Sequence, residues 1–387
     1  MTTTPLPKLL MMSWSRPPAV SGSATVLGNL AEKFTPDEMV IIGENQPNAP
    51  ALQWRNDLPK LFTGTRYINP KQRGARWLRF AQIPYLFLKS WWIARRHGCK
   101  AILVVYPNEV YLLVAYLLAT LTRRPLYAYF HNLYAENIGV GFVYMPLAKW
   151  LQPRIFRKAR HIFTMSAGMA DYYQQEKRFV GNFSPLVHTF NEDIPPIPTS
   201  APPVQTPLQL ASAGSINSYC ADSAGRIARA VSAMDVHMMV YTGVGRDYLA
   251  TVGFVGDKFT ITILPRVELL VQLPHADMVL LPHGFVGGAS ADEINTIFPT
   301  KVIEYLICGK PIIAHTPEGA FLTDFLRQHD CAYVVTEPSI EAVREAITRV
   351  ATDEALRLRL VQNALRTAEM FHAPNVVKHL REVVSLV

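Results

Sequence analysis

The order of hydrophobic and polar positions predicts a chain that alternates between strands and helices. Short apolar runs rich in Val, Ile and Leu recur between longer stretches whose apolar residues lie three or four positions apart. In the first half the predicted strands are 9–14, 39–43, 101–106, 126–131 and 161–166, and the predicted helices are 24–34, 77–97, 110–124 and 146–159. This alternation favours parallel sheets covered by helices on both faces.

The same pattern restarts in the second half after an interruption. Residues 194–207 include six prolines and no charged residue, which predicts an extended, semi-rigid linker. Further strands are then predicted at 208–214, 238–244, 259–264, 277–283, 310–316 and 331–337. We therefore expect an α/β fold with two tandem Rossmann-like domains.

Length and composition agree with two domains. The chain has 387 residues, 49% of them hydrophobic, which is enough for two cores. Its four cysteines form no CxxC pair and are expected to be buried, reduced thiols of a cytoplasmic protein. No signal peptide and no membrane span are predicted, because the longest uncharged apolar run covers only 110–121.

Charge is divided unequally between the two halves. Residues 1–190 hold 23 Lys and Arg against 9 Asp and Glu, whereas the remainder is acidic and the total is +8. Residues 55–100 hold eleven of these cations, interleaved with aromatic residues. Such a segment suits an anionic membrane surface, although a core helix with a solvated basic face or a nucleic-acid site would have similar composition. We expect the membrane, contacted peripherally from the cytoplasmic side, and no nucleic acid.

The segment 298–316 carries the clearest candidate chemistry. Thr300 is placed to cap a short helix, and Gly309 stands where a left-handed residue ends it. Glu304 shares a face with Thr300 on a helix that is otherwise apolar, and a buried carboxylate needs a hydrogen-bonding partner. The hydroxyl pair of a ribose is one such partner, with Thr300 and Lys301 suited to phosphate. The structural alternatives are a favourable carboxylate near the helix N-terminus, or an ion pair between Glu304 and Lys301.

Three other loops follow predicted strands, where parallel sheets bind ligands. Gly22 lies in a Ser-Gly-Ser turn before the first helix, whose N-terminus suits phosphate, or it is an ordinary turn glycine. His131 ends a strand and can bond or deprotonate a hydroxyl, or be a structural histidine. Gly214, Ser215 and Asn217 can cradle an anion, or form a plain strand-to-helix connection.

These motifs resemble the family 4 glycosyltransferases, which are retaining enzymes of the two-domain GT-B fold. The resemblance rests on the PTKVIEYLICGKPII segment, on MSAGM at 165–169 and on PPAVSG at 17–22. It implies two Rossmann-like domains with an interdomain cleft: 1–193, basic and acceptor-binding, and 208–371, binding a nucleotide-sugar. Residues 194–207 would link them, and a C-terminal helix at 372–387 would cross back to the first domain.

The resemblance also implies roles for individual residues. Glu304 would bind the ribose hydroxyls, His131 would lie near the transferred sugar, and Gly22 would lie near the donor diphosphate. The first glutamate of the family's motif is replaced by Thr296, so Glu293 is expected to substitute for it in catalysis. The family's Arg and Lys after the second domain's first strand are missing, so Lys301, helix N-termini or a basic residue such as Arg266 would neutralise the diphosphate.

The expected activity is transfer of a sugar from a nucleotide-sugar to a glycan or lipid-linked acceptor, with retention. No DxD pair occurs in the sequence, so no metal and no other cofactor is expected. Two alternatives stay open: a non-catalytic GT-B protein that scaffolds glycan assembly, and a GT-B epimerase acting on the nucleotide-sugar itself. The sequence leaves the nucleotide, the sugar and the acceptor undefined.

Overall fold

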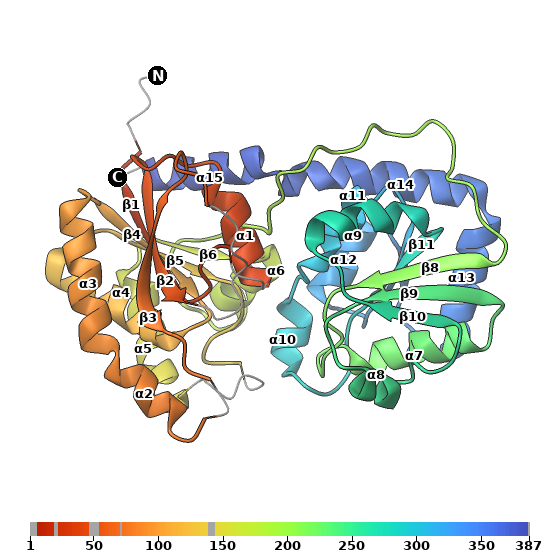
Figure 1. Ribbon diagram of the computed structural model, residues 1–387, viewed down its shortest axis with the longest axis horizontal. Helices are drawn as coiled ribbons and strands as arrows, with labels where there is room; N and C mark the ends of the chain where they lie inside the picture. Colours follow the sequence, from red (N-terminus) through yellow and green to blue (C-terminus); the bar gives the residue numbers. More distant parts are fainter. Residues whose placement is uncertain (1–5, 19–21, 46–53, 70–71, 138–143, 386–387) are drawn as a thin grey trace. The chain divides into compact units, whose positions relative to one another are not determined.

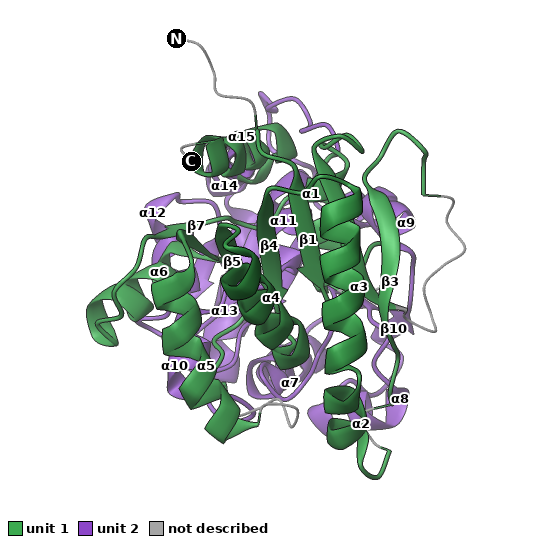
Figure 2. Ribbon diagram, turned by 90° about the vertical axis from the view of Figure 1, so that its left-hand side faces the viewer, with its two compact units in different colours: residues 1–191, 371–387 green, residues 192–370 purple. Residues whose placement is uncertain are grey.

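Two compact units make up the chain. A computed structural model describes residues 6–18, 22–45, 54–69, 72–137 and 144–385. Unit 1 comprises Met1–Asn191 with Phe371–Val387, and unit 2 comprises Glu192–Met370. The two units are coloured separately in Figure 2. Residues 194–207 form no helix or strand.

Unit 1 is built on a seven-stranded parallel sheet in the order β3-β2-β1-β4-β5-β6-β7. Its strands are β1 (Leu9–Ser13), β2 (Met39–Asn45), β3 (Lys60–Arg66), β4 (Ala101–Tyr106), β5 (Leu126–Phe130), β6 (His161–Thr164) and β7 (Phe183–Pro185). Every residue of β1, β4 and β5 is buried, which explains why these central strands are continuous apolar runs in the sequence.

Helices cover both faces of this sheet (Figures 1 and 2). They are α1 (Gly22–Ala31), α2 (Ala75–Ala81), α3 (Ile83–Arg96), α4 (Glu109–Thr122), α5 (Met145–Lys158), α6 (Ala167–Asp171) with a π-helical turn at Tyr172–Glu176, and α15 (Ala373–Ser385). Helices α3, α4 and α5 lie side by side on one face, while α15 packs beside α1. The C-terminal helix thus completes the first unit, since Val376, Leu380 and Val384 belong to its core.

Unit 2 repeats the same topology with six parallel strands in the order β10-β9-β8-β11-β12-β13. The strands are β8 (Leu208–Ala213), β9 (Val236–Tyr241), β10 (Phe259–Thr262), β11 (Met278–Pro282), β12 (Ile312–His315) and β13 (Tyr333–Val335). The helices are α7 (Ala221–Ser232), α8 (Arg246–Val252), α9 (Arg266–Gln272), α10 (Ala291–Thr296), α11 (Lys301–Ile307), α12 (Phe321–Gln328), α13 (Ile340–Thr352) and α14 (Glu354–Ala368). The predicted α/β class with two Rossmann-like units is confirmed.

Several predicted elements need correction. The single helix expected at 77–97 is two helices, because the chain bends at Gln82 just before Pro84, which lies at the start of α3. The edge strands β3 and β7 were not predicted, since neither is a fully buried apolar run. All four cysteines are buried and unpaired, as expected. No helix among the described residues is both long and apolar enough to span a membrane.

Candidate functional site

The point where strand order reverses in unit 2 lies between β8 and β11. The chain proceeds from β8 to β9 on one side of the sheet, and later to β11 on the other. Loops leaving two such strands diverge and open a crevice at their carboxyl ends, the usual ligand position in this topology. The loops concerned are 214–220 after β8 and 283–290 after β11, followed by α10 and α11.

Lys301, Gly214 and Ser215 come together at this crevice. The Lys301 ammonium donates a hydrogen bond of 3.5 Å to the Ser215 carbonyl oxygen. Gly214 has φ +90°, and a Cβ there would lie 3.4 Å from Lys301 Cε, so the lysine side chain runs over the glycine. Burial lowers the pKa of Lys301, while Cys220 and Glu304 oppose the shift. A cation from the start of α11 and a glycine with left-handed backbone after β8 therefore lie side by side, an arrangement that suits anion binding.

Glu304 is buried and pairs with an arginine rather than with Lys301. Arg266 Nε donates to Glu304 Oε1 at 3.1 Å, whereas its two terminal nitrogens both donate to the Glu192 carboxylate. Burial raises the pKa of Glu304, and Arg266 opposes that shift. The predicted alternative of a Glu304–Lys301 pair is thus wrong in its partner.

This ion-pair cluster also changes the interpretation of Arg266. All three guanidinium nitrogens already face carboxylates, so a diphosphate would have to compete with Glu192 and Glu304 for this cation. Sequence reasoning missed Glu192, and no motif marks it. Lys301, whose hydrogen bond is to a carbonyl, is the more available charge for phosphate.

The start of α11 differs from the sequence expectation. Thr300 was expected to cap the helix, but it has helical angles of φ −55° and ψ −35° and makes no side-chain capping bond. A capping side chain requires extended backbone, so this expectation is wrong. Gly309 does end the helix in the left-handed region, with φ +68°.

Glu293 acts within a capping box at the start of α10. Its backbone N–H donates to Ser290 Oγ at 3.2 Å, and its Oε2 accepts from the Ser290 backbone N–H at 3.2 Å. Tyr219 lies 3.5 Å from the other carboxylate oxygen. The SADE pattern at 290–293 is a capping-box signal that was overlooked. The fold already uses this carboxylate, and a catalytic role for Glu293 stays a prediction.

The two loops of the crevice touch backbone to backbone. A Cβ at Gly284 would lie 1.8 Å from the Tyr219 carbonyl oxygen, and one at Gly288 would lie 2.3 Å from that of Ser218. Asn217 Oδ1 accepts from the Tyr219 N–H at 3.1 Å, so this amide shapes its own loop. Gly284 and Gly288 are therefore required for close packing of the two loops.

His131 lies at the end of β5 in unit 1, beside the start of α1. Its Nδ1 is 2.9 Å from Ser23 Oγ, while its Nε2 is buried and has no hydrogen-bonding partner among the described residues. Burial, with a smaller effect of His188, holds the pKa of His131 well below 6.5, so the ring is neutral. Gly22 begins α1, and the preceding residues 19–21 lie outside the described part of the chain.

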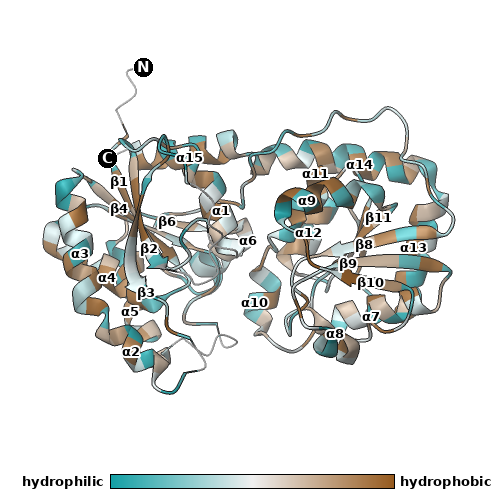
Figure 3. Ribbon diagram, in the orientation of Figure 1, coloured by the Kyte–Doolittle hydropathy of each residue, from teal (hydrophilic) through white to brown (hydrophobic). Residues whose placement is uncertain are grey.

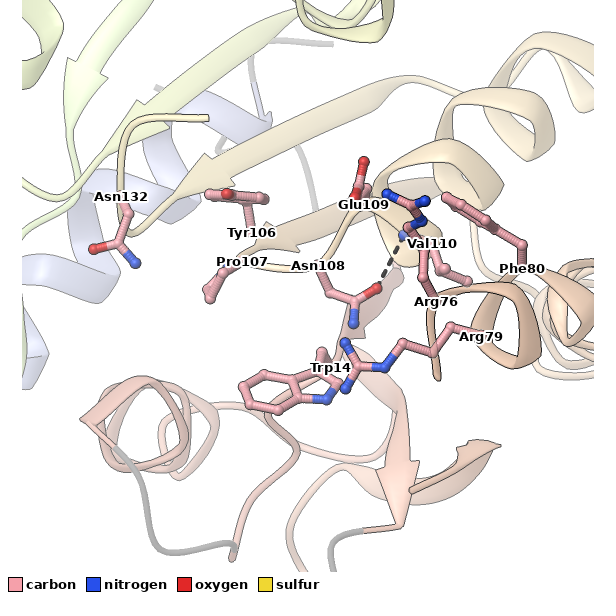
Figure 4. Close-up of a pocket in the computed structure, with 10 residues that line it drawn as sticks. All are labelled: Trp14, Arg76, Arg79, Phe80, Tyr106, Pro107, Asn108, Glu109, Val110 and Asn132. Carbon is pink, nitrogen blue, oxygen red and sulfur yellow. Dashed lines mark hydrogen bonds between the residues drawn. The ribbon is translucent and has the colours of Figure 1, made fainter. Parts of the chain in front are cut away.

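Unit 1 also contains a cavity of about 190 Å³ at the carboxyl ends of β1 and β4. Three of its lining residues, Arg76, Arg79 and Phe80, belong to the basic segment 55–100, but no sequence motif marks the cavity itself. Arg76 and Arg79 of α2 line it (Figure 4). Its walls are formed by Trp14, Arg76, Arg79, Phe80, Tyr106, Pro107, Asn108, Glu109, Val110 and Asn132.

Solved structures with the same fold cover almost the whole chain. One is the Anabaena protein HepE in complex with UDP, with 14% identity, a TM-score of 0.69 and coverage of 98% of this chain and 100% of that one. Another is sucrose-phosphate synthase from Thermosynechococcus elongatus, with 13% identity, a TM-score of 0.72 and coverage of 97% and 98%. The fold of this chain is therefore GT-B.

A family model matches part of unit 2. Residues 273–367, which include α10 and α11, match the family described as glycosyl transferases group 1. The predicted resemblance to that group is confirmed, and it supports glycosyl transfer as the activity. The sequence matches no curated protein.

Proposed function

We propose that the chain transfers a sugar from a nucleotide-sugar to a glycan or lipid-linked acceptor, with retention and without a metal. The observation that carries this proposal is the grouping of Gly214, Ser215, Lys301 and Glu304 at the strand-order reversal of unit 2. A lysine beside a left-handed glycine suits a diphosphate, and a carboxylate one helical turn along suits a ribose.

Glu304 has one oxygen to spare for a ribose. Among the described side chains Arg266 alone bonds the carboxylate, through Oε1, and the Glu304 backbone N–H contributes a further hydrogen bond. Burial raises the pKa of this carboxyl group, and the arginine opposes that rise. Charged acceptors make the stronger hydrogen bonds to hydroxyls, so Glu304 is well prepared to hold a vicinal diol.

The test is a thermal-shift panel of UDP, GDP, ADP, TDP and CMP. UDP heads the panel because similar Anabaena structures contain UDP and UDP-glucose. A nucleotide at 100 times its dissociation constant should add about 2.7 kcal/mol of stability. Glu304→Gln should weaken the nucleotide that binds by about tenfold or more, because a hydrogen bond to a charged group contributes about 1.5–3 kcal/mol.

The matched control is Glu345→Gln, an exposed glutamate on α13. Melting temperatures without ligand identify any loss of folding, since Glu304→Gln also removes a partner of Arg266. Equal nucleotide affinity in the wild type and Glu304→Gln would remove the glutamate from the donor site. Binding without transfer or hydrolysis of any sugar nucleotide would instead favour the non-catalytic scaffold.

We further propose that unit 1 contacts an anionic membrane through α2 and α3. Both helices carry hydrophobic and hydrophilic residues along their length (Figure 3). Six large apolar side chains of this α2–α3 face are each 40–63% exposed: Trp77, Leu78, Tyr85, Leu88, Trp91 and Trp92. Exposed Arg95 and Arg96 accompany them at the end of α3. Aromatic residues next to cations are typical of peripheral membrane surfaces.

Vesicle co-sedimentation checks the membrane proposal. Binding to phosphatidylglycerol vesicles should exceed binding to phosphatidylcholine vesicles and should weaken with salt. Arg95→Gln/Arg96→Gln should lower the affinity about thirtyfold, since each cation contributes about 1 kcal/mol. Lys33→Gln/Lys378→Gln removes two exposed cations elsewhere and should change little. Equal binding to both kinds of vesicle, or an equal loss of vesicle affinity in both double variants, would contradict the proposal.

A further inference from the structure

The cavity of unit 1 combines two guanidinium groups with aromatic walls. Arg76 and Arg79 are three residues apart on α2 and so share one face of that helix. Both residues line the cavity: the Arg79 guanidinium lies beside Trp14, and that of Arg76 lies beside Glu109 and Val110 (Figure 4). The Arg76 guanidinium also stacks over the Tyr144 ring, 4.9 Å from its centre. A guanidinium group is a planar fork of N–H donors that matches the oxygens of a phosphate.

The acid in this cavity does not hold either arginine in an ion pair. Glu109 Oε1 accepts from the Tyr144 backbone N–H at 2.6 Å, and its Oε2 accepts from the Tyr134 hydroxyl at 3.4 Å. Neither guanidinium hydrogen-bonds it. Two cations against one carboxylate give the cavity a net positive charge. Burial raises the pKa of Glu109, and the charges of Arg76 and Arg79 oppose that rise.

The walls are fixed in position by the ends of neighbouring strands. Trp14 follows β1, and its indole N–H donates to Glu44 Oε1 at 2.7 Å, which holds the ring in place. Asn108 caps α4 by accepting from the Val110 N–H at 2.9 Å. Tyr106 and Phe80 add further aromatic surface. A phosphate here would therefore lie among flat apolar surfaces that suit an attached sugar ring or hydrocarbon.

We propose that this cavity binds the phosphate of a phosphorylated acceptor, through Arg76 and Arg79. The inference rests on the proposed function, since it assigns the acceptor class to unit 1. The other face of α2 carries the exposed Trp77 and Leu78, so the phosphate belongs either to a membrane-bound lipid or to a soluble sugar phosphate. The chemistry that recognises it is the same in both cases.

The experiment follows Trp14 by fluorine NMR of the full chain labelled with 5-fluorotryptophan, with the resonance assigned by Trp14→Phe. Probes are inorganic phosphate, pyrophosphate, glucose 6-phosphate and glucose. We expect a saturable shift for the phosphorylated probes with dissociation constants of about 1 mM or tighter, and none for glucose. Vesicles of phosphatidylglycerol form a second arm, in which a shift from vesicles alone assigns the phosphate to a lipid headgroup.

Variants separate charge from folding. Arg76→Gln/Arg79→Gln should weaken the phosphorylated probes at least about thirtyfold, whereas Arg76→Lys/Arg79→Lys should stay within about tenfold of the wild type. Lys378→Gln, on α15 and outside the cavity, should bind as the wild type does. No saturable shift from any phosphate or vesicle, or equal affinities in the Gln and Lys variants, would overturn the proposal.

This readout needs no catalytic activity. Loss of nucleotide binding in the thermal-shift panel would refute the proposed function while leaving the Trp14 response intact. Conversely, an unresponsive Trp14 in a protein that binds nucleotides would refute the acceptor phosphate alone.

Discussion

Arg266 shows how one side chain can join segments that are far apart in sequence. It links Glu192, the first residue of unit 2, to Glu304 on α11. Removing one partner of a buried ion pair costs about 3–5 kcal/mol, because the remaining charge stays buried. Arg266, which the sequence suggested for phosphate, thus holds the carboxylate of Glu304 in place.

His161 gives a residue-scale prediction about acid stability. Its Nε2 lies 2.7 Å from Ser184 Oγ, which lies 2.9 Å from His379 Nε2 on α15. Burial, aided by His379, lowers the pKa of His161 to about 4. Between pH 6.5 and about 4 the unfolded chain takes up a proton that the folded chain does not, so stability is lost as the pH falls. After allowance for partial exposure, we expect about 1–2 kcal/mol from this group.

Urea unfolding followed by tryptophan fluorescence measures this effect, because all six tryptophans lie in unit 1. His161→Gln should flatten the fall in stability between pH 6.5 and 4.5 while keeping a hydrogen bond to Ser184. His372→Gln lies outside this chain of contacts and should keep the wild-type slope. An unchanged slope in His161→Gln would show that other groups cause the acid loss.

At the residue scale, the sequence predicted which side chains lie close together, but not which hydrogen bonds and ion pairs they form. Gly214, Ser215, Lys301 and Glu304 were chosen by position after strands and on a helix tip, and the structure brings Lys301 against the first two. The Arg266–Glu304 bond spans 38 positions, and nothing local encodes it. The capping box at Ser290–Glu293 is visible in the local sequence. It was overlooked because Glu293 was considered only as a catalytic residue.

The loops after β8 and β11 give a prediction at the scale of elements. Gly284→Ala would drive a methyl group into the Tyr219 carbonyl and push the loops apart, with an expected loss of about 3 kcal/mol. Gly287→Ala is the matched control, since its Cβ would meet nothing within 4 Å and only its φ of +84° opposes alanine, at about 1 kcal/mol.

Chemical denaturation and the nucleotide thermal shift should be measured on both variants. Because the displaced loop carries Ser215, Gly284→Ala should lose nucleotide affinity as well as stability. If the two variants are equally stable and bind equally, the backbone contact does not hold the crevice together.

Helices and strands could be predicted from the sequence where a single property, such as burial on both faces of a sheet, determined the residue pattern. The buried strands follow from apolar runs, and β1, β4 and β5 were found for this reason. Strand β3 has a mixed burial pattern and includes Gly64, whose missing side chain makes room for Leu86 and the Tyr111 hydroxyl. Such a strand is stabilised mainly by packing against neighbouring elements. These tertiary contacts cannot be identified from a single sequence.

At the scale of the whole molecule, the two units repeat one topology, and this repetition allowed the fold and the position of the candidate residues to be predicted. Both units place their first strand in the middle of the sheet and reverse order beside it, so candidate residues fall at the carboxyl ends in each. The charge split follows the units as well, since the basic cavity and the α2–α3 face belong to unit 1. The cavity itself was not predictable, because its walls come from α2, β4, α4 and the residues that follow β1 and β5.

The C-terminal helix has a consequence for how the protein is made. Unit 1 takes Val376, Leu380 and Val384 into its core, yet these residues follow the whole of unit 2 in the chain. On a ribosome adding about 5–20 residues per second, unit 1 would wait about 10–35 s for its last helix. The acidic half, though second in the sequence, is therefore the first to have all its residues available to fold.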